Sequence, residues 1–230
     1  MPKCLWTAIT ALALLITASA AASANPLPIN QLPMYGGRAK TEEMKSADAD
    51  FIASMEKSGL SRADGAKQVL GRGWAAWAKG DTTTAMARFN QAWLLDPENG
   101  NVYHGFALIT AGRDGTASEV ERFFRLATSR PKVDAEAFVD YGKFLWMVKR
   151  LDESQAELNK ALRISATARN ARSHVAFTYY LKNDFTNACT WAREARNNGD
   201  ELERGFLEEM CNRAGKPDEG KPASPAGPPA

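Results

Sequence analysis

Imidazole chemistry in this 230-residue chain could come only from His104 and His174. They stand far apart in the sequence, so we do not expect them to share a metal ion. His104 is open to two main interpretations, a hydrogen-bonding group of a binding surface or a structural residue, and catalysis is the weakest alternative.

The glycines of 112–115 lack the lysine that a phosphate loop requires. The acidic pairs at 152–153 and 208–209 are more typical of helix starts and solvated faces. The sequence therefore predicts no catalytic residue, no metal and no cofactor.

The cysteines offer redox chemistry instead. Cys4 lies in the leading segment 1–24, so removal of that segment would leave only Cys189 and Cys211. An even pair in an oxidising compartment predicts a disulfide. The alternative is two buried free thiols, because cysteine often serves as a small apolar residue. A bridge requires the two Cα atoms to lie within about 7 Å.

The leading segment resembles an export signal. Lys3 precedes an apolar run from Leu5 to Ala22, and Ala22-Ser23-Ala24 fits a signal-peptidase site. We expect residues 1–24 to be a signal peptide and the mature chain to be exported, periplasmic or secreted. The run is shorter and richer in small residues than a spanning helix needs, although a retained anchor remains the alternative.

Charge excludes two classes of partner. Removal of residues 1–24 takes away one charged side chain, Lys3, and leaves 28 basic against 27 acidic residues. Such a balance is too neutral for a nucleic-acid or membrane-surface protein. We therefore expect a protein or peptide partner, no nucleic acid and no membrane insertion after signal cleavage. The oligomeric state stays open.

The helices that must position these residues are predicted by the spacing of four alanines. Ala92, Ala127, Ala161 and Ala195 are spaced 35, 34 and 34 residues apart, a period typical of helical-hairpin repeats. Seven residues before each alanine the residue is mostly small, and three residues before it the residue is mostly larger. The alanine and these two positions lie on one face of a helix. The two sets are Ala85, Val120, Ser154 and Ala188, and Phe89, Phe124, Leu158 and Ala192.

A preceding helix in each unit also carries a small residue. Gly73, Ala107, Gly142 and Ala176 lie 19 or 20 residues before the four alanines. Small residues on both helices allow a close crossing. Each unit is therefore predicted to be a helix, a short turn and a second helix. Gly80-Asp81 shows this turn in the first unit, because glycine ends helices and aspartate caps them.

The pattern resembles the tetratricopeptide repeat. Ala85-x3-Phe89-x2-Ala92-x4-Pro97 matches the second half of that motif, and Val120-x3-Phe124-x2-Ala127 with Pro131 matches it less closely. The stretch 87–97 also resembles small exported bacterial repeat proteins. The resemblance implies an all-α fold, a right-handed superhelical solenoid of antiparallel helix pairs. We expect about four repeats, at 66–99, 100–134, 135–168 and 169–202.

Flanking segments complete the predicted organisation. Residues 25–40 are rich in proline and glycine and are expected to form an extended lead-in to a helical domain over 41–214. A helix is expected from Thr41 to Ser58, and a capping helix over 201–213. The tail 215–230 holds five prolines and three glycines, a composition typical of disorder.

Members of the tetratricopeptide family bind peptide segments on the concave face, which the first helix of each unit lines. The resemblance implies that the corresponding groove residues here include Trp74, Trp77, His104, Leu108, Lys143, Trp146, Phe177 and Tyr180. The alternative for each aromatic residue is packing between helices. Lys143 is the one basic residue at the positions of the family's carboxylate clamp, so an apolar or aromatic-bearing partner is expected.

The sequence thus favours an exported protein-interaction scaffold that binds a peptide or protein partner in an aromatic-rich concave groove. An envelope assembly factor or chaperone is the alternative. A cell-wall-acting enzyme is more remote, because the repeats leave no length for a separate catalytic domain.

Overall fold

The structure of the chain is a computed structural model that describes residues 27–214. The expected signal peptide, 1–24, and the expected disordered tail, 215–230, lie outside the described residues. Over 27–214 the chain forms α-helices and two short 3-10 helices, and contains no β-strand. The all-α prediction is confirmed.

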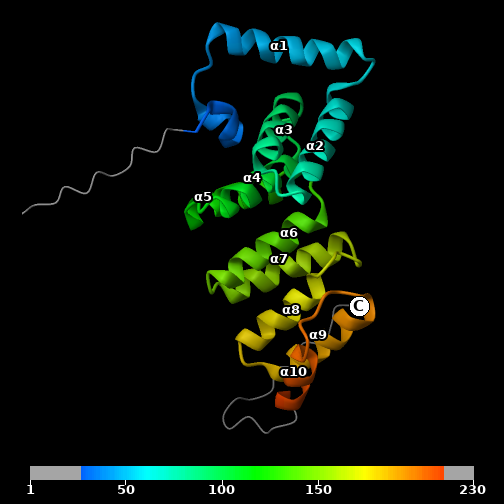
Figure 1. Cartoon of the computed structure of the whole chain (residues 1–230). Helices are drawn as coiled ribbons and strands as arrows, with labels where there is room; N and C mark the ends of the chain where they lie inside the picture. Colours follow the sequence, from blue (N-terminus) through cyan, green and yellow to red (C-terminus); the bar gives the residue numbers. More distant parts are fainter. Residues whose placement is uncertain (1–26, 215–230) are drawn as a thin grey trace, which may run out of the picture.

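Eight of the helices form four consecutive antiparallel pairs, stacked one after another along the molecule (Figure 1). The pairs form an all-α solenoid in which each hairpin packs on the next. The pairs are α2 (Arg62–Ala78) with α3 (Thr82–Leu95), α4 (Gly100–Gly112) with α5 (Ala117–Thr128), α6 (Ala135–Met147) with α7 (Leu151–Ile164), and α8 (Ala171–Leu181) with α9 (Phe185–Asn198).

The repeating small residues lie where the sequence pattern predicts. Ala92, Ala127, Ala161 and Ala195 are all 0 % exposed. A Cβ atom on Gly73 would lie 2.5 Å from the Phe89 ring, so α2 and α3 can cross at this distance only through glycine. Gly142 has the same role against Leu158, whose Cγ would lie 2.6 Å from an added Cβ. In the first and third pairs, small residues therefore cross closely around one large side chain, Phe89 or Leu158, which is fully buried.

Several helices begin at a residue whose side chain caps the first turn. The Oδ1 atom of Asp81 accepts a hydrogen bond from the Thr84 amide at the start of α3. Thr116 and Glu119 form a reciprocal capping box at the start of α5. Asp184 caps α9 through the Asn187 amide. These caps satisfy amide groups that have no partner inside the helix.

The expected extended lead-in is wrong for the part of it that is described. Residues Ile29–Gln31 and Pro33–Gly37 form 3-10 helices that fold back against α3. The cause is Asn90, a fully buried side chain of α3. Its Nδ2 donates to the carbonyls of Asn30 (3.0 Å) and Leu32 (2.9 Å), and its Oδ1 accepts from the Tyr35 amide (3.4 Å). We call residues 27–40 the N-terminal strap.

The helix expected from Thr41 to Ser58 is present as α1 (Glu42–Lys57), with Thr41 as its cap. In Figure 1, α1 lies across the N-terminal end of the stack and joins the strap to α2. The side chains of Phe51, Ile52 and Met55 are half-buried and pack against the core of the first repeats. No residue of α1 is fully buried.

The capping helix begins later than expected. It is α10 (Phe206–Ala214), not 201–213. Residues 200 and 201 are held elsewhere, because Asp200 Oδ2 accepts from the amides of Arg172 and Ser173 (3.0 and 3.2 Å) and the Glu201 amide donates to Asn170 Oδ1 (2.9 Å). A linker therefore runs along the start of α8 before α10 begins.

Cys189 of α9 and Cys211 of α10 are joined by a disulfide, with Cα atoms 4.7 Å apart. The bond fastens α10 to the last repeat. None of the helices within 27–214 has the length and apolar character needed to cross a membrane.

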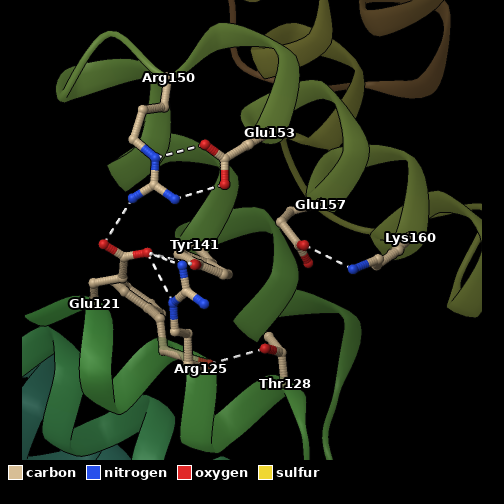
Figure 2. A network of polar contacts seen from close by, with 9 residues as sticks. Glu121, Arg125, Thr128, Tyr141, Arg150, Glu153, Glu157 and Lys160 are labelled. Carbon is tan, nitrogen blue, oxygen red and sulfur yellow. Dashed lines mark hydrogen bonds and ion pairs between the residues drawn. The ribbon is translucent and has the colours of Figure 1, made fainter.

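A charged network joins the second and third repeats (Figure 2). Arg150, in the α6–α7 turn, donates to both oxygens of Glu153 and to Glu121 of α5. Glu121 also accepts from Arg125 and from the Tyr141 hydroxyl, at 2.9 and 3.1 Å. The network fixes the packing of α5 against α6 and the following turn.

Candidate functional site

A groove of about 710 Å³ lies between α6, α8 and the linker to α10. We call it the C-terminal groove. The residues that line it come from α6, from α8 with the two residues before it, and from residues 201–206. They are Glu136, Val139, Asp140, Lys143, Trp146, Arg169, Asn170, Ser173, His174, Phe177, Glu201, Leu202, Glu203 and Phe206.

One end of the groove is aromatic. Trp146 in the last turn of α6 packs edge-to-face on Phe177 of α8, with ring centroids 4.7 Å apart. The ring of Phe206, the first residue of α10, lies 5.5 Å from that of Phe177. All three side chains are half-buried. The indole Nε1 of Trp146 is a buried donor without an acceptor among residues 27–214. Aromatic rings in a concave site bury large area at low cost in conformational entropy.

The opposite end of the groove is polar. Glu136 stands in the first turn of α6, and Arg169 pairs with Glu201 of the linker. The start of α8 would attract an anion through its free amides, but Asp200 already accepts from two of them. The helix terminus therefore offers no open position for a carboxylate of a ligand.

Between the two ends lie Asp140, Lys143 and His174. Asp140 contacts His104 of the preceding repeat, with 2.7 Å between its Oδ2 and the imidazole Nε2. Burial, helped by the nearby charge of Lys143, holds the pKa of His174 below its usual value, against the opposing effect of Asp140 and Asp200. His174 is therefore neutral at pH 7, and Lys143 carries the positive charge in the centre of the groove.

A second cavity of about 440 Å³ lies between the N-terminal strap and the α4–α5 corner. Its walls include Leu32, Met86 and Phe123, and Arg113 on its rim donates to Gln31 and to the Thr82 carbonyl. The strap itself forms much of this cavity. Within residues 27–214, no three His, Cys, Asp or Glu side chains gather as a metal site would require.

Several solved structures are similar to this arrangement of helix pairs. The crystal structure of PilW, described as a type IV pilus biogenesis factor, matches with a TM-score of 0.53 at 13% identity, over 76% of this chain and 89% of that one. Cut9, in its complex with Hcn1, matches with a TM-score of 0.54 at 16% identity, over 66% of this chain and 30% of that one. YrrB, described as a TPR protein with an unusual peptide-binding site, matches at 0.48 and 15% identity, over 71% and 90%. No family model and no curated protein matches the sequence.

The chain has a tetratricopeptide-type fold. Its repeats combine a period of about 34 residues with small residues at the crossing of each helix pair.

Three of the eight residues predicted for the groove of this tetratricopeptide-type fold line the C-terminal groove. They are Lys143, Trp146 and Phe177. The other five lie elsewhere. Trp74 packs between Phe89 and His104 with ring centroids 5.0 Å from each, and His104 is 5 % exposed. Trp77 and Leu108 are half-buried against the core of the first repeats.

Tyr180 lies outside the groove lining because α10 covers it. Its hydroxyl donates to Glu209 and accepts from Arg213, and its ring lies 5.5 Å from Phe206. The expected position on the inner helix is therefore occupied by the chain's own terminal helix.

Sequence reasoning missed several lining residues. Asp140 and His174 lie three residues before Lys143 and Phe177 on the same helices, so helical periodicity could have added them to the predicted set. Leu202, Glu203 and Phe206 carry no such signal, because their position depends on the contact of Asp200 with α8.

Proposed function

We propose that this chain is a protein-interaction scaffold that binds an extended segment of a partner protein in the C-terminal groove. The observation that carries the proposal is the aromatic end of the groove, where Trp146, Phe177 and Phe206 present three half-buried rings around one hollow. Binding sites combine such apolar walls with a few polar groups that fix orientation. Asp140, Lys143 and Ser173 supply those groups here.

We also propose that the scaffold works outside the cytoplasm. The leading segment 1–24 has the composition of an export signal. The Cys189–Cys211 bond supports this location, because disulfides persist mainly in oxidising compartments. Mass measurement of the protein recovered from the producing cells tests this point. A chain that begins at Asn25 is expected, and a chain that keeps residues 1–24 in the cytoplasm would contradict it.

The groove proposal is tested by capture of partner proteins on the immobilised chain, followed by quantitative mass spectrometry. An aromatic anchor typically contributes about 2 kcal/mol to binding. The double variant Trp146→Ala/Phe177→Ala should therefore capture the partner at least about thirtyfold more weakly than the natural chain.

Met147→Ala is the matched control, because Met147 neighbours Trp146 on α6, is 63 % exposed and does not line the groove. It should leave capture unchanged. If the folded double variant retained full capture, the binding surface would have to lie away from the C-terminal groove.

A further inference from the structure

The C-terminal groove is aromatic at one end and acidic at the other. The proposed scaffold function does not by itself require this difference. Its aromatic end is formed by the last turn of α6 and the first residue of α10, and its polar end by the first turn of α6 and the linker. The lining contains four carboxylates and two basic side chains. The groove is therefore acidic as a whole, and the charges are unevenly distributed.

The acidic surplus is concentrated at the polar end. Arg169 is paired there with Glu201. Glu136 and Glu203 are exposed, and neither forms an ion pair with a basic residue of the described chain. Asp200 already occupies the amides at the start of α8, so this end repels a ligand carboxylate and attracts a cation.

The centre of the groove has no such acidic surplus, because it holds one carboxylate, Asp140, and one ammonium group, Lys143. Lys143 is exposed and lines the groove one helical turn from Trp146. Asp140 is engaged by His104. In a bound peptide, a basic residue next to the aromatic anchor would therefore lie near Lys143 and be repelled. A basic residue farther from the anchor would lie near Glu136 and Glu203 and be attracted.

The spacing between the two ends follows from helix geometry. Glu136 and Trp146 are ten positions apart on α6, which is about 15 Å at 1.5 Å per residue. An extended peptide rises about 3.3 Å per residue, so it covers this distance in four or five residues.

On the basis of the proposed function, we infer that the C-terminal groove selects an extended peptide with an aromatic or large apolar anchor and a basic residue four or five positions away. The anchor fills the hollow between Trp146, Phe177 and Phe206. The basic residue lies between Glu136 and Glu203, and the residues between them pass Lys143 and carry no positive charge.

Four fluorescein-labelled peptides test the inference with the purified full chain by fluorescence anisotropy. Each has a Trp-Leu anchor. The first carries a Lys-Arg pair after three Gly/Ser residues, the second an Asp-Glu pair at that place, the third a Ser-Asn pair, and the fourth a Lys-Arg pair directly beside the anchor. We expect the first to bind about tenfold tighter than the second and several-fold tighter than the third and fourth. The preference should shrink as salt screens the exposed charges.

Substitution locates the preference. In the variant Glu136→Gln/Glu203→Gln, the affinities of the first and second peptides should differ by less than about twofold. The control variant Glu194→Gln/Glu208→Gln has the same change in net charge outside the groove and should keep the tenfold preference. If all four peptides bind equally, the inference is overturned and the proposed groove stands. If none binds, both fail. If binding appears only after removal of residues 215–230, the groove belongs to the chain's own tail, which also overturns the inference.

Discussion

The Nε2 atom of His104 lies 2.7 Å from the Oδ2 atom of Asp140, so a buried residue of α4 fixes a carboxylate that lines the groove on α6. The imidazole also packs against Trp74 and Phe124. The N-terminal repeats, which do not line the C-terminal groove, therefore hold one of its polar groups in place.

His104→Ala should lower the free energy of unfolding by about 1–3 kcal/mol, because it leaves a cavity and removes a hydrogen-bond partner of Asp140. Urea denaturation measures the change. Lys143→Ala, at an exposed position of the same groove, is the control and should stay within about 0.5 kcal/mol of the natural chain. Equal stability of the two variants would show that the His104–Asp140 contact contributes nothing.

Asn90→Ala should release the N-terminal strap. The variant loses the three hydrogen bonds to the backbone of Asn30, Leu32 and Tyr35, each worth about 1 kcal/mol net. We expect the free energy of unfolding to fall by about 3 kcal/mol and amide exchange over residues 31–38 to become faster. Gln91→Ala, one position along α3, should change neither. Unaltered exchange in the Asn90 variant would mean that other contacts hold the strap.

Acid should weaken the network around Glu121. Burial raises the pKa of Glu121, but hydrogen bonds from Arg150, Arg125 and Tyr141 outweigh burial and hold that pKa below its ordinary value of 4.5. Because the folded-state pKa is the lower one, the carboxylate stabilises the fold above about pH 4.5, and this contribution is lost as the pH falls through the folded-state value.

Glu121→Gln should therefore be less stable than the natural chain at pH 7 and should lose less stability between pH 7 and pH 3. Thermal melts across that range measure the slope. Glu42→Gln removes a carboxylate whose side chain is 89 % exposed and should leave the slope unchanged. Parallel pH curves for Glu121→Gln and the natural chain would contradict the account of the network.

The disulfide should stabilise the end of the solenoid. Cys189 and Cys211 are separated by 22 positions, and closing such a loop contributes about 3 kcal/mol in the chain-entropy model. Reduction, or Cys189→Ser/Cys211→Ser, should lower the melting temperature and increase amide exchange in α10. Two titratable thiols in the denatured, unreduced protein from its native compartment would show that the bond does not form.

The sequence was most informative where structure depends on local pattern. The spacing of Ala92, Ala127, Ala161 and Ala195 predicts the helix pairs, because small residues recur wherever two helices cross. The strap and the linker could not be predicted in this way. Asn90 binds backbone about 55 to 60 residues earlier in the chain, and Asp200 caps a helix that starts nearly 30 residues before it.

The position of the groove depends on the same long-range contacts. The resemblance to the tetratricopeptide repeat indicated Lys143, Trp146 and Phe177 on α6 and α8. The wall formed by Leu202 and Phe206 exists only because the linker is held along α8. The same arrangement of α10 covers Tyr180, which a repeat-by-repeat reading places on the open face.

Site-specific photo-crosslinking in the producing cells tests the central claim most directly. A photoreactive residue placed at Lys143 or at Glu203, both exposed on the groove, should crosslink to one segment of the same partner protein, identified by mass spectrometry. A photoreactive residue at Ile164, which is 53 % exposed on α7 and outside the groove lining, should not crosslink to that segment. Crosslinks from position 164 with none from positions 143 and 203 would contradict the assignment of the C-terminal groove as the binding site.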